Sequence, residues 1–397
     1  MRYFVMFMLA LTSGLASSQP VRAQQQTGVL ALVSHEETYL FGQSITFRAQ
    51  LILPSSTKVA NLLFKADGEE SAHVLSIQPD AQGNVSQTYL ISEVAVRPFA
   101  TVHYNYRVTL NSGEELTSDD LTFQYEDNRF TWQVLNQDEI SVHWYGNDLS
   151  FGQAALDVAM RGIKKANQLV LPPQIKPMDI YIYASNNDLT QAVETGGITY
   201  VGGHASPDLH LALVSITPGL EQGLEMDQKI PHELAHILTY DLMPQRYTRL
   251  PVWLREGIAS QAELAPNPDY PQALSQASEQ EDLMPIDELC EAFPPETGRL
   301  FLAYAESESF TRFIIDKYGQ PGLLALTNAY GGGLNCQQGM QQSLGKSLSE
   351  MEADWRARSL GEKAGLTAFT NLFPYLAILV VLLAVSLISA FSQKRPE

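Results

Sequence analysis

Only two cysteines occur among the 397 residues of this chain. This scarcity excludes a disulfide-dense scaffold and a zinc module built from several cysteines. Basic residues are also few, with 25 Lys and Arg against 44 Asp and Glu, which gives a net charge of −19. Such a chain lacks the clustered cations that bind a phosphate backbone, so we predict no nucleic-acid partner. We attribute the acidity to solubility.

Apolar side chains, in contrast, are abundant. The chain is 45% hydrophobic and 17% charged, which is typical of folded globular proteins and excludes global disorder. Its length suits two or three domains of ~100–200 residues. We therefore predict a multidomain protein.

The N-terminus has the features of a secretory signal peptide over residues 1–23. Arg2 supplies a short basic region, an apolar core follows, and Val21 and Ala23 are the small residues expected before a cleavage site. The alternative, a buried N-terminal helix, is disfavoured because a polar stretch follows directly.

The C-terminus predicts a membrane span. Residues 372–391 contain no charged side chain, and twenty helical residues cross a ~30 Å hydrocarbon core. Lys394 and Arg395 favour a cytoplasmic tail at 392–397, so the expected location is the cell membrane, as a single-pass protein with its ectodomain outside. A buried core helix and a removed lipid-anchor signal are the alternatives, and the basic tail argues against the second.

Cys290 and Cys336 would lie in an oxidising compartment and could pair. A bridge that closes ~47 residues contributes roughly 4 kcal/mol in the chain-entropy model. Two buried free thiols are the alternative, since the sequence does not show the geometry of a bridge.

Residues 27–126 alternate between apolar and polar side chains with a period of two, and Gly- and Asn-containing turns separate the alternating segments. The apolar positions are Ile45, Phe47, Ala49 and Leu51; Val102, Tyr104, Tyr106 and Val108; and Leu121, Phe123 and Tyr125. Short strands at this spacing predict an all-β sandwich of the immunoglobulin or fibronectin kind. We find no chemistry in this segment and interpret it as a binding or spacer module.

Residues 128–360 change to a mixed pattern of strands followed mostly by helices, which predicts an α+β domain. We expect strands at 140–144, 179–183 and 209–216, helices at 150–169, 300–317 and 347–358, a helix that holds residues 232–240, and a loop or short irregular helices over 264–286.

One motif in this domain carries chemistry. The sequence His232-Glu233-Leu234-Ala235-His236 has the form H-E-x-x-H. Residues four apart share a helix face, so both imidazoles can bind one Zn²⁺ while Glu233 serves as general base. Pro231 is tolerated at a first helical position, so the helix begins at the motif or is kinked there.

A catalytic zinc site needs a third protein ligand. Leu242 stands where a third histidine would mark the metzincin type. Glu256, twenty residues after His236, can return from a second helix and complete a His₂Glu set.

HELAH followed by WLREGIA at 253–259 resembles the gluzincin branch of zinc metallopeptidases, in particular the peptidase MA-like proteins. The likeness covers roughly 128–360 and includes the stretch 303–310. It implies His232, His236 and Glu256 as zinc ligands, Glu233 as catalytic base and a thermolysin-like arrangement with a small sheet over the active helix. The segment 208–216 would be the sheet edge that pairs with an extended substrate.

The chain also departs from better-known relatives. It has no G-x-M-E-N segment, and Ser260 stands where thermolysin-type enzymes carry an Asp that supports a histidine ligand. Tyr304 is our first choice for stabilising the oxyanion, and Tyr247, eleven residues after His236, is the second. We interpret the nearby His204 and His210 as ordinary polar residues.

These observations predict a membrane-anchored zinc metallopeptidase that hydrolyses peptide bonds of a peptide or protein substrate outside the cell. One alternative is a non-catalytic adhesion or scaffold protein with a metallopeptidase-like domain. Another is a metal-dependent hydrolase of a non-peptide bond. No feature predicts a cleavage preference or an oligomeric state.

Overall fold

A computed structural model describes residues 27–92, 95–146, 148–194 and 202–361, with seven further positions between 372 and 382. The predicted signal peptide at 1–23 and tail at 392–397 lie outside these residues, as does most of the predicted span at 372–391. Within the described part of the chain, no helix combines the length and apolarity needed to cross a bilayer. The chain divides into two compact units, and the second also takes up residues 40–43 and 91–100 of the N-terminal region.

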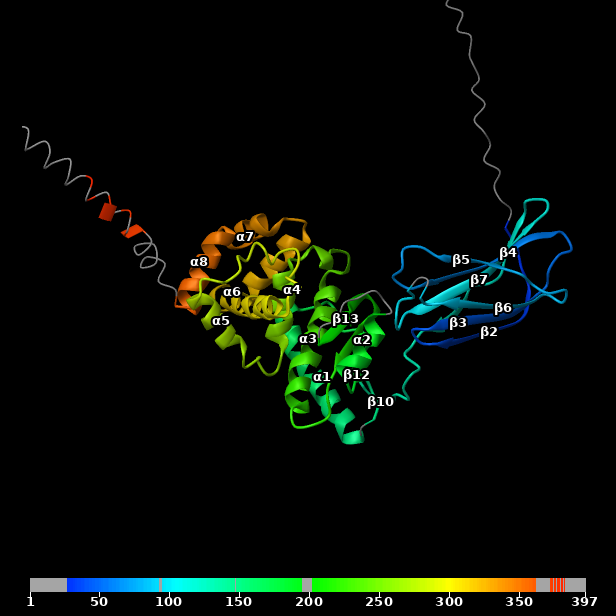
Figure 1. Cartoon of the computed structure of the whole chain (residues 1–397), viewed down its shortest axis with the longest axis horizontal. Coiled ribbons are helices and arrows are strands. Elements are labelled where there is room, and N and C mark those ends of the chain that lie inside the picture. The colour runs from blue at the N-terminus through cyan, green and yellow to red at the C-terminus, as the bar shows by residue number, and fades with distance from the viewer. Residues whose placement is uncertain are drawn as a thin grey trace, which may run out of the picture. The chain divides into compact units, whose positions relative to one another are not determined.

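The first unit is all β (Figure 1). Its larger sheet has the order β1-β8-β7-β4-β5 with β9 paired to β7, and its smaller sheet has the order β2-β3-β6. The strands are β1 (Thr27–Val29), β2 (Leu32–Leu40), β3 (Ser44–Leu51), β4 (Thr57–Ala66), β5 (His73–Ile77), β6 (Asn84–Leu90), β7 (Thr101–Leu110), β8 (Glu115–Thr117) and β9 (Leu121–Gln124).

The period-two pattern places one face of each main strand in the core, as predicted. Buried and less buried residues alternate along β3 and β7. Phe47 of the smaller sheet meets Phe64 and Tyr104 of the larger one, with ring centroids 5.3 and 5.1 Å apart. The two sheets therefore share an apolar core, which is the defining property of a sandwich.

The second unit contains a five-stranded sheet in the order β10-β11-β12-β14-β13. Its inner strands β11, β12 and β14 are mutually parallel, while β10 and β13 run antiparallel to their neighbours. Its strands are β10 (Gln133–Gln137), β11 (Ile140–Trp144), β12 (Met178–Tyr183), β13 (Gly203–Ser206) and β14 (Leu211–Ser215).

Two helices connect these strands, so the domain is α/β rather than the predicted α+β. They are α1 (Leu149–Val170) and α2 (Asn186–Glu194). The predicted apolar face of α1, with Ala155, Ala159 and Ala166, is buried against the sheet and α3. Asp148 caps its N-terminus by accepting a hydrogen bond from the Phe151 backbone N–H at 3.2 Å.

The sheet edge differs from our prediction. The segment 208–216 contains β14, which lies between β12 and β13 and is not an edge. A short 3₁₀ turn, η1 (Pro207–Leu209), precedes it, and His210 adopts a left-handed conformation, so the strand starts only at Leu211. The edge strand beside the helix that carries the H-E-x-x-H motif is β13. Among the described strands it pairs only with β14, and the pairing is antiparallel.

The motif helix α3 (Gln222–Leu242) begins ten residues before His232 and runs through Pro231. Pro231 has no N–H for the Asp227 carbonyl, and the Leu264 N–H donates to that carbonyl instead, at 2.8 Å. Gly162 of α1 makes room for the proline ring, because a β-carbon there would lie 2.8 Å from Pro231 Cβ. The structure thus accommodates a proline inside the helix.

The remaining elements are helical: η2 (Pro244–Arg249), α4 (Val252–Ala262), α5 (Tyr270–Glu279), α6 (Thr297–Gly331), α7 (Cys336–Leu344) and α8 (Leu348–Ser359). Gly319, with φ +66°, and the nearby Pro321 break α6 in two. The predicted pairing of Cys290 with Cys336 is confirmed, and the disulfide joins the segment before α6 to the start of α7.

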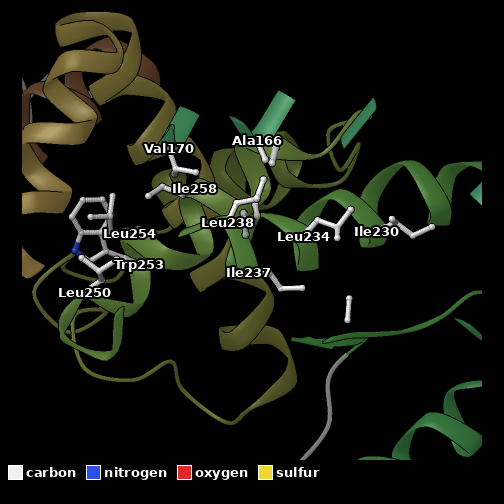
Figure 2. Close-up of a cluster of buried hydrophobic side chains, with 14 of the residues drawn as sticks. Ala166, Val170, Ile230, Leu234, Ile237, Leu238, Leu250, Trp253, Leu254 and Ile258 are labelled. Atoms are coloured by element: carbon white, nitrogen blue, oxygen red, sulfur yellow. The ribbon is translucent and has the colours of Figure 1, made fainter. Parts of the chain in front are cut away.

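A continuous apolar core joins α1, α3 and α4 (Figure 2). It includes Ala166 and Val170 of α1, Ile230, Leu234, Ile237 and Leu238 of α3, and Trp253, Leu254 and Ile258 of α4. This packing fixes α4 against the motif helix, and so sets the position of Glu256.

Candidate metal centre

His232, His236 and Glu256 converge, although the glutamate lies on a different helix from the histidines. Nε2 of His232 and Nε2 of His236 each lie 3.4 Å from the same oxygen, Oε2 of Glu256. One ligand atom from each residue lies within 4.8 Å of the other two. The four-residue spacing of the histidines and the packing of α4 on α3 bring these atoms together.

These donors fit a tetrahedral metal ion. Zn–N and Zn–O bonds of about 2.0–2.1 Å at a tetrahedral angle place neighbouring ligand atoms ~3.4 Å apart. The observed separations agree with that value. Burial opposes ionisation of Glu256, but His236 and His232 hold its pKa well below the usual range, so the carboxylate is charged and able to bind a cation.

The other ring nitrogen of each histidine has its own partner. Nδ1 of His232 lies 2.9 Å from Oε1 of Glu263, and Nδ1 of His236 lies 2.9 Å from the hydroxyl of Tyr247. A proton on Nδ1 that is donated to these oxygens leaves the Nε2 lone pair free for a metal. Glu263 thus supplies the support that Ser260 does not.

Glu263 lies outside the two sequence motifs, although its spacing from Glu256 provides a signal for it. It follows Glu256 by seven residues, or two helical turns, so it lies at the C-cap of α4 on the same side as Glu256. Tyr247 is our second choice for the oxyanion, after Tyr304, but its hydroxyl contacts His236 instead. Burial raises its pKa even though Arg255 lies beside it, so the hydroxyl remains protonated.

The glycine after Glu256 sets how closely α4 approaches α6. A β-carbon at Gly257 would lie 2.6 Å from the Ser307 carbonyl oxygen and would also collide with the Thr311 side chain. Only glycine lets α4 pack this closely. The glycine of the WLREGIA segment therefore has a packing role beside the ligand position.

Glu233 is buried beside the edge strand, with 6% of its surface exposed. A β-carbon at Gly203 of β13 would collide with its carboxylate, so a larger residue there would displace the Glu233 side chain. Burial raises the pKa of Glu233, while the charges of His232 and His236 oppose the shift. A carboxylate with a raised pKa is a stronger base near neutral pH.

Two cavities meet at this centre and share Gly203, His232, Glu233 and Tyr304. One, of about 360 Å³, continues past Gln228, Lys229, Tyr270 and Phe301. The other, of about 260 Å³, continues past His204, Tyr247, Arg255 and Glu256.

Of Tyr304, His204 and His210, the first two line the cavities and the third does not. Tyr304 lines both of them, with its ring centroid 6.3 Å from that of His232. His204 lies on β13 and lines the smaller cavity, and burial lowers its pKa to about 4, so it is neutral at pH 7. His210 instead contacts Asp241 at 2.9 Å. Because the sequence predicts the edge at 208–216, it does not place His204, on the true edge strand β13, beside the metal centre.

The sheet, the motif helix and the three converging side chains define a metallopeptidase-like domain. The chain belongs to the Peptidase MA superfamily, whose family model matches residues 158–360, just over half of the chain. No protein of curated function matches the chain.

Solved structures resemble the chain only weakly. A third fibronectin III domain of the human KIAA0343 protein is 12% identical, with a TM-score of 0.21 over 29% of this chain and 95% of that one. A purple acid phosphatase from yellow lupin is 10% identical, with a TM-score of 0.22 over 51% and 40%. A polysaccharide deacetylase from Bacillus cereus is 10% identical, with a TM-score of 0.20 over 46% and 59%. At such low TM-scores, these structures indicate neither a fold nor a function for this chain.

Proposed function

We propose that the chain is a zinc-dependent peptidase of the gluzincin type, with a thermolysin-like arrangement and His232, His236 and Glu256 as zinc ligands. The observation that carries the proposal is the approach of both Nε2 atoms to one oxygen of Glu256 at 3.4 Å, beside a buried Glu233. That geometry suits a tetrahedral ion with one position left for a non-protein ligand. Because none of the four residues is replaced, the adhesion alternative is not favoured.

Zn²⁺ held by His232, His236 and Glu256 would supply Lewis-acid chemistry to a water molecule and to the scissile carbonyl. Glu233 accepts a proton from the attacking water and returns it to the leaving amine. Burial raises the pKa of this carboxyl, which favours its acceptance of the proton. Glu263 and Tyr247 orient the two imidazoles.

Tyr304 is the residue that we assign to the developing oxyanion. It lines both cavities beside His232, so its side chain is near the scissile bond of a substrate that spans them. A phenol that donates a hydrogen bond to the oxyanion stabilises the transition state. Tyr247 is less suited, because its hydroxyl contacts His236 Nδ1.

The substrate is a peptide or protein segment in an extended conformation. β13 has one edge without a partner among the described strands, and Gly203 at its start lies against Glu233. An extended chain that pairs with this edge would cross from one cavity to the other, with its scissile bond at the metal centre.

We further propose that the enzyme is anchored in the cell membrane by residues 372–391, with its catalytic unit outside. This proposal rests on the sequence of the two chain ends. A reporter fused after Glu397 should be cytoplasmic, and protease added to intact cells should reach the catalytic unit. A reporter accessible from outside would reverse the topology.

Metal analysis combined with cleavage profiling tests the catalytic proposal. The full-length chain should hold about one zinc ion, cleave members of a proteome-derived peptide library, lose activity to a chelator and regain it with added Zn²⁺. Cleavage that persists in chelator would contradict the zinc mechanism. A metal-loaded chain that cleaves no peptide would contradict the peptidase assignment.

A further inference from the structure

Arg255 differs from the other half-buried arginines of the second unit. Each of the others forms an ion pair with a carboxylate: Arg97 with Asp208, Arg129 with Asp127, Arg299 with Asp282 and Arg356 with Glu352. Among the described residues, no carboxylate lies within ion-pair distance of Arg255, and its buried Nε has no hydrogen-bond partner. Its positive charge is thus uncompensated.

This unpaired charge lies at the metal centre. Arg255 precedes Glu256 on α4 and lines the smaller cavity together with His204 and Tyr247. Its guanidinium carbon lies 5.4 Å from the centroid of the Tyr247 ring. That contact holds the guanidinium in place through a cation–π interaction, but it does not neutralise the charge.

The cavity favours an anionic group from outside the chain. A partly desolvated guanidinium without a counter-ion is unfavourable, and its planar fork of N–H donors matches a carboxylate. The two carboxylates that share the cavity already have other partners, because Glu256 lies 3.4 Å from both Nε2 atoms as a ligand of the proposed metal ion and Glu233 lies beside the same two imidazoles. Neither compensates Arg255.

We propose that Arg255 binds a carboxylate of the substrate and makes this enzyme selective for peptides that carry one next to the scissile bond. The inference rests on the proposed function, since it assigns the specificity of the same site. The carboxylate belongs either to an acidic side chain or to a free peptide C-terminus. Both present the same chemistry to the guanidinium, and the experiment separates them.

The test uses four versions of one peptide that cleavage profiling identifies. They carry Glu or Gln near the scissile bond, each with a free or an amidated C-terminus. Wild-type full-length chain should show kcat/KM about tenfold or more higher for the version with the recognised carboxylate, as for a charge-assisted hydrogen bond. In Arg255→Gln this ratio should fall to about one, and Arg255→Lys should retain part of it.

Arg161→Gln is the matched control, because it removes an exposed arginine that pairs with Asp227 outside both cavities. It should leave the ratio unchanged. A wild-type ratio near one, or an Arg255→Gln variant that lowers kcat/KM equally for all four peptides, would overturn the inference. The second result would assign Arg255 to the oxyanion or to the fold.

Binding of the same peptides separates this inference from the proposed function. The fluorescently labelled peptides are titrated against full-length Glu233→Gln loaded with Zn²⁺, with and without Arg255→Gln. An Arg255-dependent preference in binding without any cleavage by wild type would contradict the proposed function and leave this inference standing. Cleavage by wild type without such a preference would contradict this inference alone.

Discussion

The two units treat buried charge in opposite ways. Among the described residues, the first unit buries no charged side chain, and Ser118 is its one buried polar residue besides the tyrosines. The second unit buries six carboxylates: Asp127, Glu233, Asp241, Glu263, Glu306 and Glu308. Burying a carboxylate is unfavourable unless it is paired. Two of the six, Glu233 and Glu263, line the cavities at the candidate metal centre, whereas the first unit buries no carboxylate among its described residues.

The pairing of these carboxylates divides them further. Three form ion pairs, for example Asp241 with Lys176 and Asp127 with Arg129, and Glu263 accepts a hydrogen bond from His232. Glu233 and Glu306 form none among the described residues. Burial raises the pKa of both, and for Glu306 the value is about 8. One of these two carboxylates lines the cavities and the other lies in the core, so different functions are expected.

The largest expected effect separates the two units. His232→Ala should lose most of its zinc and its activity, because two ligands cannot complete the site. Phe47→Ala in the first unit should keep zinc while it lowers the free energy of unfolding by about 3–5 kcal/mol. Zinc analysis and denaturant unfolding of both full-length variants check this. Loss of zinc from folded Phe47→Ala, or full retention in His232→Ala, would break the comparison.

Tyr304→Phe should lower kcat by about 10²–10³-fold with unchanged zinc content, since it removes an oxyanion donor and keeps the ring. Tyr247→Phe serves as the matched variant. If Tyr247→Phe lowers kcat in this way and Tyr304→Phe does not, the two roles must be exchanged.

The partners of the histidine ligands should affect metal affinity more than chemistry. Glu263→Gln and Tyr247→Phe each weaken a hydrogen bond that orients an imidazole, so zinc affinity should fall about 10–100-fold. Competition with a chelator of known affinity measures this. Ser260→Ala is the control, and it should leave the affinity unchanged if Glu263 has replaced the residue expected there.

Glu306 should produce the smallest effect, visible only as a dependence of stability on pH. Its folded pKa of about 8 exceeds the unfolded value, so the folded state binds the extra proton between about pH 4.5 and 8. Stability is therefore highest below this window and falls as pH rises through it. Glu306→Gln should remove this slope and become more stable than wild type near pH 8.

Urea unfolding at pH 5 and pH 8 measures the Glu306 effect, with the exposed Glu288→Gln as control. An identical pH dependence in wild type and Glu306→Gln would show that this carboxyl does not titrate abnormally.

Features set by local periodicity could be predicted from the sequence. The buried faces of β3, β7 and α1 follow from periods of two and 3.6, and the i, i+4 histidines follow from the helix itself. Glu256 could be predicted because a third ligand is needed and a carboxylate twenty residues after His236 can return from a second helix, and the resemblance of the WLREGIA segment to gluzincins supports the same residue. With only two cysteines the disulfide has one possible pairing, but the sequence leaves free thiols as an alternative, and the structure shows the bridge.

Features set by long-range pairing could not be predicted. Whether β13 or β14 forms the edge depends on which strand pairs with β12, and no residue within either strand specifies this. The continuation of α3 through Pro231 depends on Leu264 and Gly162, which are distant in sequence. The contact between Tyr247 and His236 likewise depends on how η2 folds back. Each of these outcomes rests on tertiary contacts that override local propensity.

The most direct measurement of the central claim compares wild type with Glu233→Gln, with zinc content and peptide turnover determined on the same samples. Glu233 faces the cavities and is not one of the three converging ligands, so the amide should keep about one zinc ion per chain. Turnover should fall by ~10²-fold or more, the scale of a lost general base. Equal turnover by the two proteins, with zinc present in both, would contradict the mechanism.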